Sequence, residues 1–170
     1  MMKNFNFNVA LIAIVCSELL ILSGCSKSRP SDLPELVPVT LKITQEGKPL
    51  AGATVNLSAT DPISVYTAAG STDENGVCLL YTHGQYKGSP LGKFKVRVSR
   101  TEIIPKPTPR PKSAAENEVF MKNAKTNPPK TYQFVEEVYT KAELTPLEIE
   151  ITGAMEKSFD VGKAVKVVIP

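Results

Sequence analysis

The chain has 170 residues, of which 42% are hydrophobic and 22% are charged. This length suits one domain of ordinary size, and the composition is that of a globular protein. The net charge of +3 is too small to indicate nucleic-acid binding, and no basic stripe with interleaved aromatics is present. With 14 prolines and no tryptophan, the composition favours turns and loops.

Residues 1–24 are predicted to be a signal peptide and not part of the fold. Their polar start contains Lys3, and an apolar run follows at 9–22. This run has the length of a signal-peptide core and is short for a membrane-spanning helix. Glu18 lies inside the run and lowers its hydrophobicity.

The end of this run, Leu22-Ser23-Gly24-Cys25, resembles the lipobox of bacterial lipoproteins. The resemblance implies cleavage between Gly24 and Cys25 and acylation of Cys25 by fatty acids such as palmitate, which anchor a protein stably when two or more are attached. Ser26, in place of an aspartate, implies the outer membrane of the cell envelope, with the domain facing the periplasm or the exterior. The alternative is an ordinary secretory signal with a chance cysteine.

The three cysteines leave no disulfide for the mature domain. Cys16 lies in the signal and Cys25 is the predicted lipid site, so only Cys78 remains. Cys78 lies in an apolar run, which predicts a small buried hydrophobe rather than a reactive thiol. No CxxC motif and no Cys/His cluster is present, so the sequence predicts neither a metal site nor another cofactor.

Two regions follow Cys25. Residues 25–36 are polar and contain Pro30 and Pro34, which predicts a flexible tether. Residues 37–170 form the predicted domain, in which apolar and polar residues alternate with the period of half-buried strands. The predicted strands are 36–44, 53–60, 64–69, 77–82, 92–100, 147–152, 158–161 and 164–169.

Glycine, asparagine and aspartate mark the turns between the first strands. The residues assigned to turn and fold motifs are Gly47, Gly52, Asp73, Asn75, Gly76 and Gly92. The cluster at 73–76 was also weighed as a calcium site, because its side chains carry oxygen. A hard cation needs six to eight oxygen ligands, however, and a turn of this length does not supply them.

The alternating pattern stops at 101–131, which is predicted to be a long proline-rich insertion. Alternating prolines at 105–112 predict an extended, polyproline-like stretch, and 114–125 has room for one or two helical turns. Structureless segments of this length inside a small domain are usually functional or mobile. A binding site is therefore expected here and in the neighbouring loop at 83–91, although the mixed charges favour no ligand class.

Short strands separated by turns, with no convincing long helix, predict an all-β fold: an immunoglobulin-like or transthyretin-like antiparallel β-sandwich of about seven strands. Within 39–98, the motifs GKPLAGATV, TDENG and LGKFKVRV in this order resemble the carboxypeptidase regulatory-like domain, which is transthyretin-like. The later segment, with Tyr139-Thr140, Glu143 and Thr145-Pro146-Leu147, resembles bacterial lipoproteins that carry this domain. Cys78 stands where an aromatic residue is usual in that family.

The resemblance implies a non-enzymatic binding or structural module anchored to the membrane through Cys25. Transthyretin-like folds also include a hydrolase of purine breakdown and iron-dependent dioxygenases, all of which need more than one histidine. His83 is the only histidine here, and it lies in a polar turn. No enzyme activity and no catalytic residue is therefore expected, and the hydrolase stays an unfavoured alternative.

Two other functions have weaker support in the sequence. A carbohydrate-binding module of the cell surface would use exposed aromatics, although the chain lacks tryptophan. The candidates are Tyr66, Tyr81, Tyr86, Tyr132, Phe134 and Tyr139. A self-made amide cross-link between Lys42 and Asp160 would need burial beside an acid, and Lys42 lies on the predicted wet face of its strand.

Overall fold

The structure is a computed structural model, and it describes residues 29–61, 66–106, 109 and 111–169. The predicted signal peptide, the lipobox and Cys25 lie outside the described residues. Residues 34–170 form one compact unit. In the part of the chain that the structure describes, no helix has the length and apolarity of a membrane span.

The predicted tether is only partly described. In it, the Leu33 amide donates a hydrogen bond of 3.2 Å to the carbonyl of Pro30, which closes a local turn. Leu36, the last residue of the predicted tether, already lies in a strand. That strand, β1 (Leu36–Val37), pairs with β9 (Ser89–Pro90).

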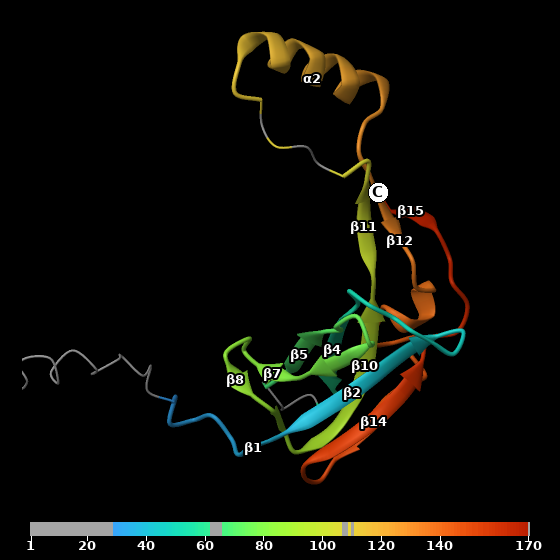
Figure 1. The fold of residues 1–170 in the computed structure, drawn as a ribbon. Coiled ribbons are helices and arrows are strands. Elements are labelled where there is room, and N and C mark those ends of the chain that lie inside the picture. The colour runs from blue at the N-terminus through green and yellow to red at the C-terminus, as the bar shows by residue number, and fades with distance from the viewer. Residues whose placement is uncertain (1–28, 62–65, 107–108, 110, 170) are drawn as a thin grey trace, which may run out of the picture. The chain divides into compact units, whose positions relative to one another are not determined.

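Residues 34–170 are built on two facing sheets, so the chain is an all-β sandwich (Figure 1). The first sheet is antiparallel and has the order β13 (Glu148–Ile151), β10 (Gly92–Ser99), β4 (Thr54–Ala59), β5 (Ala68–Ser71), β7 (Tyr81–Thr82) and β8 (Tyr86–Lys87). The second sheet contains β14 (Met155–Asp160), β2 (Val39–Gln45) and β3 (Lys48–Pro49), and β6 (Val77–Leu79) also pairs with β2.

One pair departs from the predicted antiparallel arrangement. Strand β14 runs parallel to β2, with Phe159 opposite Ile43 in the register. A parallel pair needs a long connection between its strands, and here most of the chain lies between them. The described ranges hold more and shorter strands than the seven predicted, because long predicted strands are interrupted, the first of them at Pro38.

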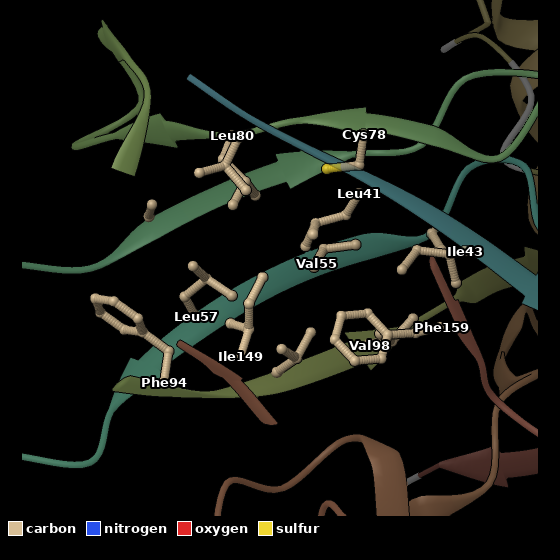
Figure 2. Packing of buried hydrophobic residues seen from close by; sticks show 14 of the residues in the cluster. Leu41, Ile43, Val55, Leu57, Cys78, Leu80, Phe94, Val98, Ile149 and Phe159 are labelled. Carbon is tan, nitrogen blue, oxygen red and sulfur yellow. The ribbon is translucent and has the colours of Figure 1, made fainter. Parts of the chain in front are cut away.

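The core lies between the two sheets and follows the alternation predicted from the sequence. On β2 the buried residues are Val39, Leu41 and Ile43, each at most 3% exposed. They face the other sheet, whose buried residues are Val55, Leu57, Phe94, Val96, Val98, Ile149 and Ile151. Figure 2 shows labelled members of this cluster pointing toward one another between the strands.

The chain crosses between the two sheets at Leu80. Strand β6 pairs with β2 in the second sheet, whereas β7, one residue further on, pairs with β5 in the first. The Leu80 side chain is 1% exposed and fills the space at this crossing. Its amide donates to the carbonyl of Val39, and its carbonyl accepts from Gly88.

Segment 101–131 has more regular structure than the one or two helical turns expected there. Strand β11 (Thr101–Ile104) follows directly after β10, pairs with β12 (Lys130–Gln133), and β12 pairs in turn with β15 (Val167–Ile169). These three strands form a third antiparallel sheet, and a helix, α2 (Ala114–Thr126), lies between β11 and β12 in the chain (Figure 1). The predicted polyproline stretch lies partly outside the described residues.

Helix α2 is longer than the one or two turns predicted. Ser113 is its N-cap and accepts a hydrogen bond of 3.3 Å from the amide of Glu116, whose carboxylate in turn accepts from the amide of Lys112. These contacts satisfy amides that a helix start leaves without intrahelical partners. No residue of α2 is buried, so packing against the sandwich does not stabilise it.

Two further predictions need correction. The strand predicted at 64–69 is found as β5, which begins at Ala68; residues 64 and 65 lie outside the described part. The polar loop predicted at 83–91 contains the short strands β8 and β9. A short 3-10 helix, η1 (Glu137–Tyr139), follows β12.

Candidate functional site

A groove lies between β15 and the segment that carries η1. Its volume is about 700 Å³, within the range of ligand sites. Most of the side chains that line it are aliphatic, with an ion pair between Lys141 and Glu137 at the rim. The lining residues are Gln133, Val135, Glu136, Glu137, Val138, Thr140, Lys141, Val165, Val167, Val168 and Ile169.

The third sheet presents an apolar row to solvent beside this groove. In the register, Ile169 lies opposite Thr131, and Thr131 lies opposite Ile103, so these three side chains share a face. Ile169 is 37% exposed and Ile103 is 45% exposed, and Val167 on the same face is 55% exposed. Contiguous exposed apolar surface of this kind marks interaction sites more often than isolated residues do.

The outer edge of β15 has free backbone groups. The amide of Phe134 donates to the carbonyl of Arg100, which sets the alternation along β12. Every second residue of β12 directs its backbone groups to β11, and the residues between them, Thr131 and Gln133, direct theirs to β15. On β15 the partners Val167 and Ile169 therefore use their backbone groups in the ladder. Val168, between them, directs its N–H and C=O away from β12 to an edge where no described strand pairs.

Two polar side chains, those of Lys166 and Gln133, lie next to this edge. The ammonium group of Lys166 lies 4.7 Å from the centre of the Tyr132 ring, which holds its charge over β12. The Nε2 atom of Gln133 is buried at the groove and has no hydrogen-bonding partner among the described residues. Buried polar groups are nearly always paired, so this donor is suited to an acceptor on a bound partner.

A second hollow, of about 480 Å³, lies beside α2. Phe120 and Ala124 of the helix and Pro105 and Pro129 of the adjoining chain supply its apolar walls. This hollow is within the segment where a binding site was expected. It adjoins residues 107–110, which the structure describes only in part.

The predicted turn residues serve the scaffold. Gly47, Gly52, Gly76 and Gly92 all have positive φ, between 67° and 136°. Asp73 accepts hydrogen bonds of 2.8 Å from the amides of Asn75 and Val77 with one carboxylate oxygen. The oxygen-rich cluster at 73–76 is thus a hydrogen-bonded turn, and no group of three metal-ligating side chains occurs among the described residues.

His83 is exposed, as predicted, and its ring meets the edge of the Tyr66 ring at a centroid distance of 5.6 Å. The two aromatics nearest the groove have cations over their rings. Lys166 lies over Tyr132, and the guanidinium of Arg100 lies 5.4 Å from the centre of Phe134. Each of these cations covers one face of its ring.

Cys78 lies in β6 within the core, 0% exposed, so the prediction of a buried small hydrophobe is confirmed. Desolvation by burial raises the pKa of its thiol to about 11. The thiol is therefore protonated at neutral pH and is a poor nucleophile.

The proposed cross-link between Lys42 and Asp160 is not supported by the register. Lys42 lies opposite Ser158, whereas Asp160 lies opposite Thr44. The Asp160 carboxylate accepts from the Thr44 hydroxyl at 2.8 Å and from the Gly47 amide at 3.0 Å. Lys42 is exposed, so neither the geometry nor the burial that such a bond requires is present.

The groove residues were missed as a site from the sequence. Val165, Val167 and Ile169 alternate, and this period was interpreted as the inward face of a final strand. Alternation shows which residues share a face, but not whether another sheet covers that face. The sequence has no clear signal for this groove, because its lining comes from segments that are not adjacent in the chain.

Comparison with protein-family models, with curated proteins and with solved structures finds no match to this chain. The fold itself defines the class: an all-β sandwich of antiparallel sheets with one parallel pair. The third sheet and the groove beside it distinguish this chain within that class.

Proposed function

We propose that this protein is a lipid-anchored, extracytoplasmic binding module without enzyme activity, and that it binds a polypeptide partner at the groove. The observation that carries the proposal is that exposed aliphatic side chains lie beside an edge of β15 with which no described strand pairs. An extended polypeptide can pair with such an edge while its alternate side chains enter the groove.

The polar groups of the groove fit the same kind of partner. The buried Nε2 of Gln133 has no acceptor among the described residues, and a polypeptide offers a carbonyl at every residue. Successive side chains of an extended polypeptide point to opposite faces, so every second side chain of the partner would contact Val138 and Val167. The partner is therefore expected to have aliphatic residues at those alternate positions. The resemblance to carboxypeptidase regulatory-like lipoproteins supports a non-enzymatic role for the sandwich, by analogy of fold.

The anchor is tested by Cys25→Ser in the full-length chain, with Cys78→Ser as the matched control. We expect the wild type and the control to incorporate labelled palmitate and to fractionate with the outer membrane. The Cys25→Ser variant should do neither. Intact mass of the mature protein provides the direct readout, and an unmodified Cys25 would overturn the anchor.

The binding site is tested by a photo-crosslinking amino acid at Val138, in the groove, in living cells of the source. The matched control carries the same group at Glu74, an exposed turn position on the sandwich. We expect discrete protein adducts from position 138 and none of the same mass from position 74. Equal adducts at both positions, or none at either, would contradict binding at the groove.

A further inference from the structure

We propose that the partner at β15 is a second copy of this chain, whose β15 pairs antiparallel with the first about a two-fold axis at Val167. The two third sheets would then join into one continuous sheet with a self-complementary interface. This inference rests on the proposed function, because it names the polypeptide that the groove and the edge bind.

Within its three described residues, Val167–Ile169, the edge of β15 has neither a charged side chain nor a proline; Lys166 precedes them and Pro170 follows them in the sequence. Natural edge strands are blunted by charged side chains, prolines or bulges. The described residues of β15 are all aliphatic, and the nearest charge, on Lys166, is held over the Tyr132 ring on the side of β12. The edge is therefore open to a strand whose own side chains are uncharged.

The alternation of backbone hydrogen-bonding groups at the edge allows two copies of β15 to pair about a two-fold axis. The amide of Val165 points to the carbonyl of Phe134, and Val167 and Ile169 pair with β12, so Lys166 and Val168 direct their backbone groups outward. An axis at Val167 places Lys166 of each copy opposite Val168 of the other. Each such pair can exchange two backbone hydrogen bonds, as in any antiparallel ladder.

Side-chain chemistry selects this axis over its neighbours. An axis at Lys166 would bring two ammonium groups directly opposite each other, which is destabilising. An axis at Val168 would place Lys166 opposite Pro170, which has no amide to donate. The axis at Val167 instead pairs aliphatic with aliphatic side chains, Val167 with Val167 and Val165 with Ile169, on the groove face.

A pair of strands this short is a weak interface in solution. A shared membrane changes this, because two anchored copies diffuse in one plane and their effective concentration rises. The association is therefore expected between full-length, membrane-bound copies.

Disulfide formation at the axis tests the register. In membranes carrying the full-length protein, Val167→Cys faces itself across the two-fold axis at a non-hydrogen-bonded position, where the side chains lie closest. Mild oxidation should convert this variant to a covalent dimer on non-reducing gels. Glu74→Cys, which is exposed and belongs neither to β15 nor to the groove lining, is the control for random collision and should remain monomeric.

A second pair of variants tests the hydrogen bonds. Val168→Pro removes an amide from the free edge but none from the ladder with β12, so the fold should persist. With the full-length proteins in lipid vesicles, chemical cross-linking should give a dimer for the wild type and only a monomer for Val168→Pro. Thermal unfolding of both proteins checks that the sandwich is intact.

The outcomes separate the two proposals. Cross-linking of Val167→Cys no greater than that of Glu74→Cys, together with a monomeric wild type, overturns self-association. Adducts from position 138 to a different protein would then leave the proposed binding function in place. The absence of both cross-links would remove both.

Discussion

The Asp160 carboxylate ties the end of β14 to the turn between β2 and β3. Its oxygens accept from the amides of Gly47 and Gly162 and from the Thr44 hydroxyl, at 2.8 to 3.0 Å. The hydrogen bond from the Gly47 amide, followed by that from Thr44, lowers the pKa of this carboxyl group below its ordinary value. Hydrogen bonds of this kind favour the ionised form.

This shift predicts a pH dependence of stability. Because the folded-state pKa is lowered, the stabilisation is present above the unfolded-state value, about 3.9, and is lost as the pH falls through the folded-state value. Asp160→Asn should therefore lower the free energy of unfolding at pH 7, and the difference from wild type should shrink at pH 3. Urea denaturation at both pH values measures it. Glu156→Gln, on the same strand, is the control, and an equal loss at both pH values for Asp160→Asn would contradict the mechanism.

Gly76 and Gly47 have nearly the same φ, 74° and 75°, but different surroundings. A Cβ on Gly76 would lie 2.4 Å from the carbonyl oxygen of Ile43, whereas a Cβ on Gly47 would meet nothing within 4 Å. Gly47→Ala should cost only the left-handed backbone strain, about 1–2 kcal/mol. Gly76→Ala should lower the free energy of unfolding by more than Gly47→Ala does, because backbone atoms of β2 must move. Chemical denaturation of the pair gives the difference, and equal losses would show that the contact does not matter.

At the scale of elements, the strands on the core and β15 were predictable, whereas the pairing of β11, β12 and β15 into a third sheet was not. Alternation located β2, β4, β10 and β13 because two facing sheets cover one face of each strand. Strands β11 and β12 are short and half exposed, so their composition has no such period. Their pairing depends on a contact between residues about 30 positions apart, which local pattern does not encode.

Helix α2 had a signal that the sequence interpretation did not use. Ser113-Ala-Ala-Glu116 matches the capping box, and good helix formers follow it. One or two helical turns were expected at 114–125, and the flanking prolines do not prevent a longer helix between them. The groove could be foreseen even less, because it joins residues from β12, η1 and β15.

The cap makes a local prediction. Ser113→Ala removes the side-chain acceptor for the Glu116 amide and should destabilise α2 by about 1 kcal/mol. Since α2 has no buried residue, the midpoint of global unfolding should not change. Hydrogen exchange should become faster in α2 alone. Ser99→Ala, on β10, is the control for the loss of a hydroxyl; a shift of global stability in Ser113→Ala would show that α2 is coupled to the sandwich.

At the scale of the whole molecule, the rate at which the Cys78 thiol is labelled measures how often the two sheets separate. Cys78 lies on β6, which pairs with β2, and its side chain is completely buried in the shared core. No local opening of a loop exposes it. We expect thiol reagents to label it in native protein only through global unfolding, at a rate that rises with urea in step with the unfolding constant. Fast labelling without urea would show that β6 separates from the sandwich by itself.

The parallel pair of β14 and β2 has a consequence for the order in which this chain can be assembled. Strand β2 is synthesised early, but its neighbour on one side is not available until residues 155–160 have followed. Pairing across such a separation is slow, because most of the chain must be closed into a loop first. During synthesis, this edge of β2 therefore stays unpaired until β14 has been made. An arrest of synthesis before residue 155 would leave that edge exposed to chaperones and to aggregation.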